Sequence, residues 1–150
     1  MGLAININLP ECAKPFVKWA GGKGQLLDIF EQYYPASLRE GGIRRYIEPF
    51  VGGGAVLFEI LQKYRIEETI VFDINEDLIN TYNVIKNNVD ALVEYLSDLE
   101  YRYLKLSKDA RKEMYYDVRE AYNSRTLKKN QPDIERAAQF IFLNRTCFNG

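Results

Sequence analysis

The chain has 150 residues, of which 47% are apolar and 27% are charged, and its net charge is −1. These values are typical of one globular domain and not of a disordered or fibrous protein. The sequence has no histidine, which excludes a Ser-His triad, a Cys-His pair and a His-ligated zinc. Its two cysteines, Cys12 and Cys147, are far apart and unpatterned, so we predict neither a disulfide framework nor a metal site.

The hydropathy pattern gives no sign of a membrane or of secretion. No apolar run approaches the roughly 20 residues that cross a bilayer. The first ten residues lack a basic segment followed by an apolar core, so no signal peptide is predicted. We expect a cytoplasmic protein.

The first part of the chain shows helical and strand patterns in turn. Apolar residues at helical spacing predict a helix over residues 26–33, which Pro35 ends. A strand, a glycine loop, a helix and a second strand are expected next, over residues 45–51, 52–54, 55–64 and 69–74. This order predicts a βαβ unit with a right-handed crossover.

From Asn75 onward every pattern is helical. Asn75 is expected to cap a helix over residues 76–88. Three more helices are expected over residues 90–106, 109–125 and 133–146, with a polar, basic loop at 124–132. Two parallel strands are too few for a stable doubly wound sheet. The predicted fold class is therefore α/β, with a partial Rossmann-like domain in residues 1–88 and a helical segment in residues 89–150.

Charge is divided unevenly along the chain. Residues 1–100 hold 9 Lys and Arg against 15 Asp and Glu, whereas residues 101–150 hold 11 against 6. A basic second part suggests contact with a polyanion, although a solvated helix surface explains the same charges. The residues predicted to contact phosphates are Arg125, Lys128, Lys129 and Arg145.

The strongest motif is the stretch from Glu48 to Gly54, EPFVGGG. Glycines between a strand and a helix let the backbone approach a ligand, and the helix N-terminus favours a carboxylate or a phosphate. Gly52 and Gly54 fit the dinucleotide pattern, but Leu57 occupies its third small position, which disfavours a nicotinamide cofactor. A Walker loop is also disfavoured, because Gly24 follows Lys23 where Ser or Thr is required.

Asp73 lies at the C-terminal end of the second predicted strand, about 20 residues past the glycine loop, which is the spacing at which a carboxylate reaches ribose hydroxyls. The alternative is that Asp73 caps the next helix. A glycine loop for an amino-acid group together with a ribose-binding carboxylate fits S-adenosylmethionine.

Four blocks of the sequence resemble the Dam-type DNA adenine-N6 methyltransferases, namely KWAGGK, EPFVGGGAVLF, FDINEDLINTYNVIK and FLNRTCFNG. The resemblance implies S-adenosylmethionine as cofactor, double-stranded DNA as partner, and a role in restriction-modification or DNA marking. It makes residues 1–88 the front of the cofactor-binding domain and residues 89–150 a helical segment that begins the DNA-recognition region. The cofactor contacts that it implies are Trp19, Lys23, Phe50, Gly52, Gly54 and Asp73.

The family's Asp-Pro-Pro-Tyr catalytic motif is absent, because none of the five prolines are adjacent. No catalytic residue is therefore assigned. The motif is expected past Gly150, and the chain alone is expected to be inactive and to associate through an incomplete sheet or with a missing C-terminal half. The alternatives are a split or degenerate half that binds cofactor or DNA without turnover, and a methyltransferase acting on RNA or cytosine.

Overall fold

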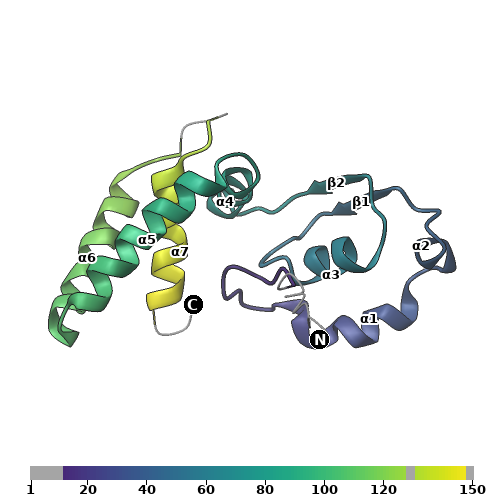
Figure 1. Ribbon diagram of the computed structural model, residues 1–150, viewed down its shortest axis with the longest axis horizontal. Coiled ribbons are helices and arrows are strands. Elements are labelled where there is room, and N and C mark those ends of the chain that lie inside the picture. The colour runs from purple at the N-terminus through teal and green to yellow at the C-terminus, as the bar shows by residue number, and fades with distance from the viewer. Residues whose placement is uncertain (1–11, 128–130, 148–150) are drawn as a thin grey trace, which may run out of the picture.

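The structure is a computed structural model that describes residues 12–127 and 131–147. Its helices gather at two ends of the molecule, with a small sheet at one of them (Figure 1). The helical elements are η1 (Lys23–Leu26), α1 (Leu27–Tyr33), α2 (Ala36–Arg39), α3 (Ala55–Lys63), α4 (Glu76–Asn87), α5 (Val89–Lys105), α6 (Lys108–Ser124) and α7 (Ile134–Thr146).

The predicted βαβ unit is present. Strands β1 (Arg45–Glu48) and β2 (Glu68–Val71) are parallel neighbours, with Glu48 beside Val71. Helix α3 connects the two strands along the chain. Both strands end earlier than predicted, β1 before the glycine loop and β2 before the turn that leads to α4. Main-chain pairing nevertheless continues, since the Val51 N–H donates to the Phe72 carbonyl over 3.0 Å.

Within the described residues, helices cover one face of this sheet and leave the other face open. Val56, Leu57 and Ile60 of α3 are buried in the clusters that Tyr46 of β1 packs against. On the opposite face, Ile47 is 52% exposed. A mixed structure with a two-stranded parallel sheet is compatible with a partial α/β methyltransferase fold.

The second end of the molecule is a helical unit made of α5, α6 and α7 (Figure 1). Helix α7 contacts α4, α5 and α6. Ala137 and Ala138 are completely buried where these helices meet, and their small side chains allow close approach of the helix backbones. None of the helices in the described ranges is both long and apolar enough to cross a membrane.

Side-chain caps fix where three of these helices begin. Asn75 accepts a hydrogen bond from the Leu78 N–H over 2.9 Å, which confirms the predicted cap of α4. Ser107 and Asp133 cap α6 and α7 in the same way. The short helix α2 was not predicted, and Pro35, which was expected to end α1, is its N-cap.

Candidate functional site

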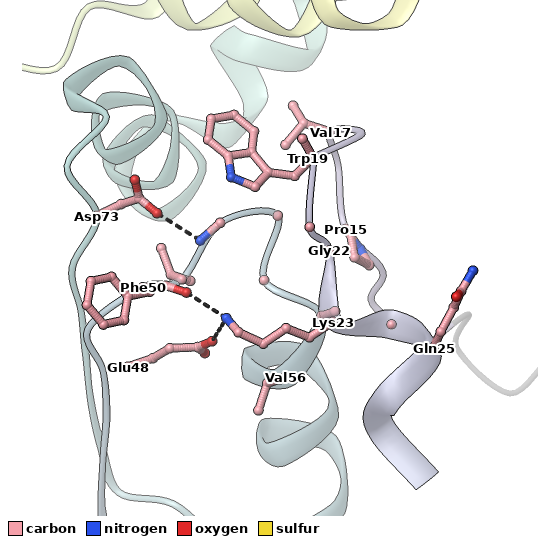
Figure 2. Close-up of a pocket in the computed structure, with 18 residues that line it drawn as sticks. Pro15, Val17, Trp19, Gly22, Lys23, Gln25, Glu48, Phe50, Val56 and Asp73 are labelled. Atoms are coloured by element: carbon pink, nitrogen blue, oxygen red, sulfur yellow. Dashed lines mark hydrogen bonds and ion pairs between the residues drawn. The ribbon is translucent and has the colours of Figure 1, made fainter. Parts of the chain in front are cut away.

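A cavity of about 390 Å³ lies at the carboxyl ends of β1 and β2. Three stretches of chain line it: residues from Pro15 to Gln25, residues from Glu48 to Val56, and Asp73 (Figure 2). All six residues predicted to contact the cofactor are in this lining. The structure therefore brings together side chains that the sequence separates by more than fifty positions.

The floor of the cavity is a glycine turn, formed by residues 52–54. Gly52 has a φ of 51° and Gly54 a φ of 82°, both in the left-handed region that favours glycine. A Cβ on Gly52 would lie 2.9 Å from Trp19 Cδ1, and one on Gly54 would lie 2.5 Å from the Tyr82 hydroxyl. The turn leads directly into α3, whose first residues Ala55 and Val56 line the cavity.

Asp73 joins the glycine turn to the end of β2. Its Oδ2 accepts a hydrogen bond from the Gly52 N–H over 3.0 Å, and its Oδ1 accepts one from the Asn75 N–H over 3.0 Å. The cap of α4 is Asn75, so Asp73 does not have the capping role that was its alternative interpretation. Each carboxylate oxygen keeps capacity to accept a second hydrogen bond.

Tyr82 of α4 also contacts the glycine turn, and this residue was not among the predicted site residues. Its hydroxyl donates to the Gly52 carbonyl over 3.0 Å, and its ring packs edge-on against Phe16. Burial, together with the charges of Glu48 and Asp73, raises the pKa of Tyr82, so the hydroxyl stays a donor. The only sequence signal for Tyr82 is its place within the FDINEDLINTYNVIK block.

Lys23 and Glu48 form an ion pair at the cavity wall (Figure 2). Lys23 Nζ donates to the Phe50 carbonyl over 2.8 Å and lies 3.5 Å from Glu48 Oε1. Tyr46 donates to Glu48 Oε2 over 2.8 Å. Burial raises the pKa of Glu48, against the opposing effects of Tyr46 and Lys23. Lys23 can thus offer a positive charge to a ligand carboxylate, while Glu48 holds it in place.

Two aromatic side chains border the cavity. The Trp19 ring lies against the glycine turn and is half-buried. Phe50 is 74% exposed, so its ring is available to a ligand while its carbonyl holds Lys23. Flat aromatic faces of this kind can enclose an apolar or heterocyclic ligand.

The predicted phosphate contacts differ in what surrounds them. Arg125 is paired with Asp133 and Glu135, so a phosphate must compete with two carboxylates for it. Arg145 is exposed, and its Nε donates to the Phe16 carbonyl over 3.1 Å. Lys128 and Lys129 lie outside the described residues.

A second concave surface, the α6 groove, was not predicted. It has a volume of about 630 Å³ and combines basic side chains with tyrosines. The charged and aromatic residues of α6 that line it are Lys108, Arg111, Lys112, Tyr115, Tyr116 and Arg119. Their spacing of three and four places them on one helix face, a signal that the sequence contained.

No cluster of three His, Cys, Asp or Glu side chains suited to a metal occurs in residues 12–127 and 131–147. The lining of the cavity combines the positive charge of Lys23, the carboxylate of Asp73 and the rings of Trp19 and Phe50.

Comparison with known proteins gives the family. A model of the D12 class N6 adenine-specific DNA methyltransferases matches residues 19–150. Over 137 residues the chain is 55% identical to a Methanocaldococcus jannaschii protein named type II methyltransferase M.MjaIII, a match that covers 91% of this chain and 47% of that protein. It is 38% identical over 138 residues to a DNA adenine methylase of Haemophilus influenzae, covering 91% of this chain and 42% of the relative.

A third relative, named DNA N-6-adenine-methyltransferase, comes from Escherichia phage P1 and is 39% identical over 140 residues, which are 93% of this chain and 16% of the phage protein. The chain thus spans less than half the length of each of these relatives. The resemblance found in the sequence blocks is confirmed. The chain belongs to the family of D12 class N6 adenine-specific DNA methyltransferases.

Proposed function

We propose that the protein carrying this chain transfers a methyl group from S-adenosylmethionine to the N6 amino group of adenine in double-stranded DNA, and that the cavity at β1 and β2 binds the cofactor. The observation that carries the proposal is the convergence of the glycine turn, Asp73 and Lys23 on one cavity. The family and the names of the relatives point to the same reaction. The proposed domain is the front of a Rossmann-like methyltransferase fold.

The chain's residues suit the parts of this cofactor. Lys23 and the N-terminus of α3 favour the carboxylate of the methionine group. The free lone pairs of Asp73 can accept hydrogen bonds from ribose hydroxyls, and Trp19 and Phe50 offer faces for the flat adenine ring. When bound, S-adenosylmethionine supplies an electrophilic methyl group, and the cavity holds it in a fixed orientation.

DNA contact is proposed for the α6 groove and for Arg145. The groove gathers the basic side chains of Lys108, Lys112 and Arg119 with two tyrosines on one helix face. Positive side chains spaced along a surface bind phosphates and release counterions, largely without regard to base sequence. The proposed place of action is the cytoplasm, where the DNA of an archaeal or bacterial cell lies.

The transfer step is proposed to need residues outside these 150. An adenine amino group is a poor nucleophile, and the base must leave the helix stack and be oriented before it reacts. No Pro-Pro pair is present to form the family's catalytic motif. We propose that the exposed sheet face at Ile47, together with the exposed Phe72 and Ile74 just past β2, is covered by a further part of the protein or by association.

Calorimetric titration of S-adenosylmethionine into the protein and its Asp73→Ala variant tests the proposal. We expect roughly tenfold weaker binding by the variant, because the ribose acceptor and the anchor of the Gly52 N–H are both lost. Asp98→Ala is the control, because it removes an α5 carboxylate that pairs with Arg102.

Equal affinity of the Asp73→Ala variant would remove Asp73 from the site. Failure of the unaltered protein to bind S-adenosylmethionine would overturn the proposed cofactor site. Binding of cofactor by the whole protein without transfer to a DNA duplex would favour the alternative, a methyltransferase half that binds without turnover.

A further inference from the structure

Asn144, near the end of α7, pairs with the main chain of Lys18. The Lys18 N–H donates to Asn144 Oδ1 over 2.8 Å, and Asn144 Nδ2 donates to the Lys18 carbonyl over 2.8 Å. A side-chain amide that meets both main-chain groups of one residue fixes the position and orientation of that residue. The contact joins the helical unit to the first segment of the cavity lining.

The residue held in this way directly precedes Trp19. Helix α7 also contacts the Trp19 side chain, because the ring of Phe140 lies 6.2 Å from it between centroids. Phe140 and Asn144 are four residues apart and therefore lie on one face of α7. The main chain before Trp19 and the Trp19 ring are thus both contacted by the same helix face.

A third contact extends this attachment. Arg145 Nε donates to the Phe16 carbonyl, so consecutive residues of α7 hold the main chain at positions 16 and 18. The cavity wall that carries Trp19 therefore depends on the helical unit, although the remaining walls belong to the βαβ unit.

We propose that Asn144 is a positioning residue for the cofactor cavity: it holds the Lys18 main chain so that the Trp19 ring stays against the glycine turn. The ligand part of this inference rests on the proposed function, whereas the position of Trp19 does not. Loss of the amide frees the wall segment, exposes the Trp19 ring and weakens ligand binding.

Asn80 provides a matched control. Its Nδ2 donates to the Asp133 carbonyl over 3.0 Å, and the Asp133 N–H donates to its Oδ1 over 2.9 Å. The amide geometry is the same, but it ties α4 to the start of α7, and neither residue lines the cavity. Asn80 is buried, so Asn80→Ala is expected to lower thermal stability at least as much as Asn144→Ala.

Trp19 is the only tryptophan in the 150 residues, which gives a direct readout. Its emission is taken as the difference between each protein and the same protein with Trp19→Phe, so that tryptophans elsewhere in a longer protein cancel. Emission maximum, acrylamide quenching, thermal midpoint and S-adenosylmethionine affinity are measured for the unaltered protein, Asn144→Ala and Asn80→Ala.

We expect Asn144→Ala to shift the Trp19 emission to the red, to increase its quenching and to weaken S-adenosylmethionine binding roughly tenfold, which equals about 1.4 kcal/mol. Asn80→Ala is expected to leave the Trp19 emission and the affinity unchanged. Asn144→Asp keeps the acceptor for the Lys18 N–H and loses the donor, so an intermediate shift is expected, and this variant decides the matter if Asn144→Ala does not fold.

Unchanged Trp19 emission in a folded Asn144 variant would overturn the inference. Equal shifts in the Asn80 and Asn144 variants would also overturn it, because they would show a general loss of stability. If the unaltered protein does not bind S-adenosylmethionine, the proposed function fails, but the emission measurements still decide the role of Asn144.

Discussion

Glu48 is a carboxylic acid that is only 6% exposed at the wall of the cavity. Burial disfavours its ionised form and raises its pKa above the ordinary 4.5, although Tyr46 and Lys23 both act in the other direction. The folded protein therefore holds this proton more tightly than the unfolded chain does. Its contribution to the free energy of unfolding is fully present below the unfolded pKa and is lost as the pH rises through the folded pKa.

The change Glu48→Gln removes this ionisation and keeps a side chain of the same shape. We predict that the melting temperature of the variant rises relative to that of the unaltered protein as the pH increases from about 4 to about 7. Scanning calorimetry across this range provides the measurement. A difference in melting temperature that does not change with pH would contradict the prediction.

Helix α6 presents a basic stripe because Lys108 and Lys112 are four residues apart and Arg119 follows two turns later on the same face. We predict that the double change Lys108→Gln and Lys112→Gln weakens binding of a DNA duplex. The slope of log affinity against log salt should become shallower by up to about 2, because each lost phosphate contact releases about one counterion fewer. Fluorescence anisotropy at several salt concentrations measures both quantities.

The control for this prediction carries the same change in charge elsewhere. Lys14→Gln and Lys86→Gln also remove two positive charges, from residues that are exposed and lie outside the groove. For this control double variant, the slope of log affinity against log salt should remain that of the unaltered protein. An equal loss in both double variants would show that net charge, rather than the face of α6, governs binding.

The helices and strands were largely predictable, because their apolar residues repeat with the period of each element. The start of α4 was predictable because its cap is local: the Asn75 side chain accepts a hydrogen bond from the Leu78 N–H, three residues away. Helix α2 was missed because four residues carry too short a pattern for periodicity to reveal. The strand ends were predicted too late, because main-chain pairing continues past both strands to Val51 and Phe72 without regular strand structure.

At the scale of the whole molecule, motif spacing and family resemblance predicted six cofactor contacts, and the structure gathers these six residues around one cavity. It did not indicate the partners that hold the cavity in shape. Asn144 and Lys18 are 126 positions apart, and Tyr82 reaches Gly52 from a different helix. Likewise, Arg125 pairs with Asp133 and Glu135, which are eight and ten positions away at the start of α7. Such pairings follow from tertiary packing, which no local pattern encodes.

A charged network connects α4, the helix that follows β2, to α6 and α7. Arg136 of α7 meets both oxygens of Asp77 of α4 and donates to the Tyr122 carbonyl, while the Tyr122 hydroxyl donates to Asp77. The side chains of Arg136 and Asp77 are only 11% and 20% exposed. In such surroundings a charge left without its partner is costly, because water cannot fully solvate it.

We predict that Arg136→Met lowers the free energy of unfolding by about 3 kcal/mol, since it leaves the Asp77 carboxylate uncompensated. Adding Asp77→Asn should recover part of this loss by removing the unpaired charge, a coupling that urea unfolding of the two single variants and the double variant measures. Arg102→Met breaks an exposed ion pair with Asp98 and should cost less than about 1 kcal/mol. If the double variant is as unstable as the sum of its two single changes, Arg136 and Asp77 do not act as a unit, and the prediction is wrong.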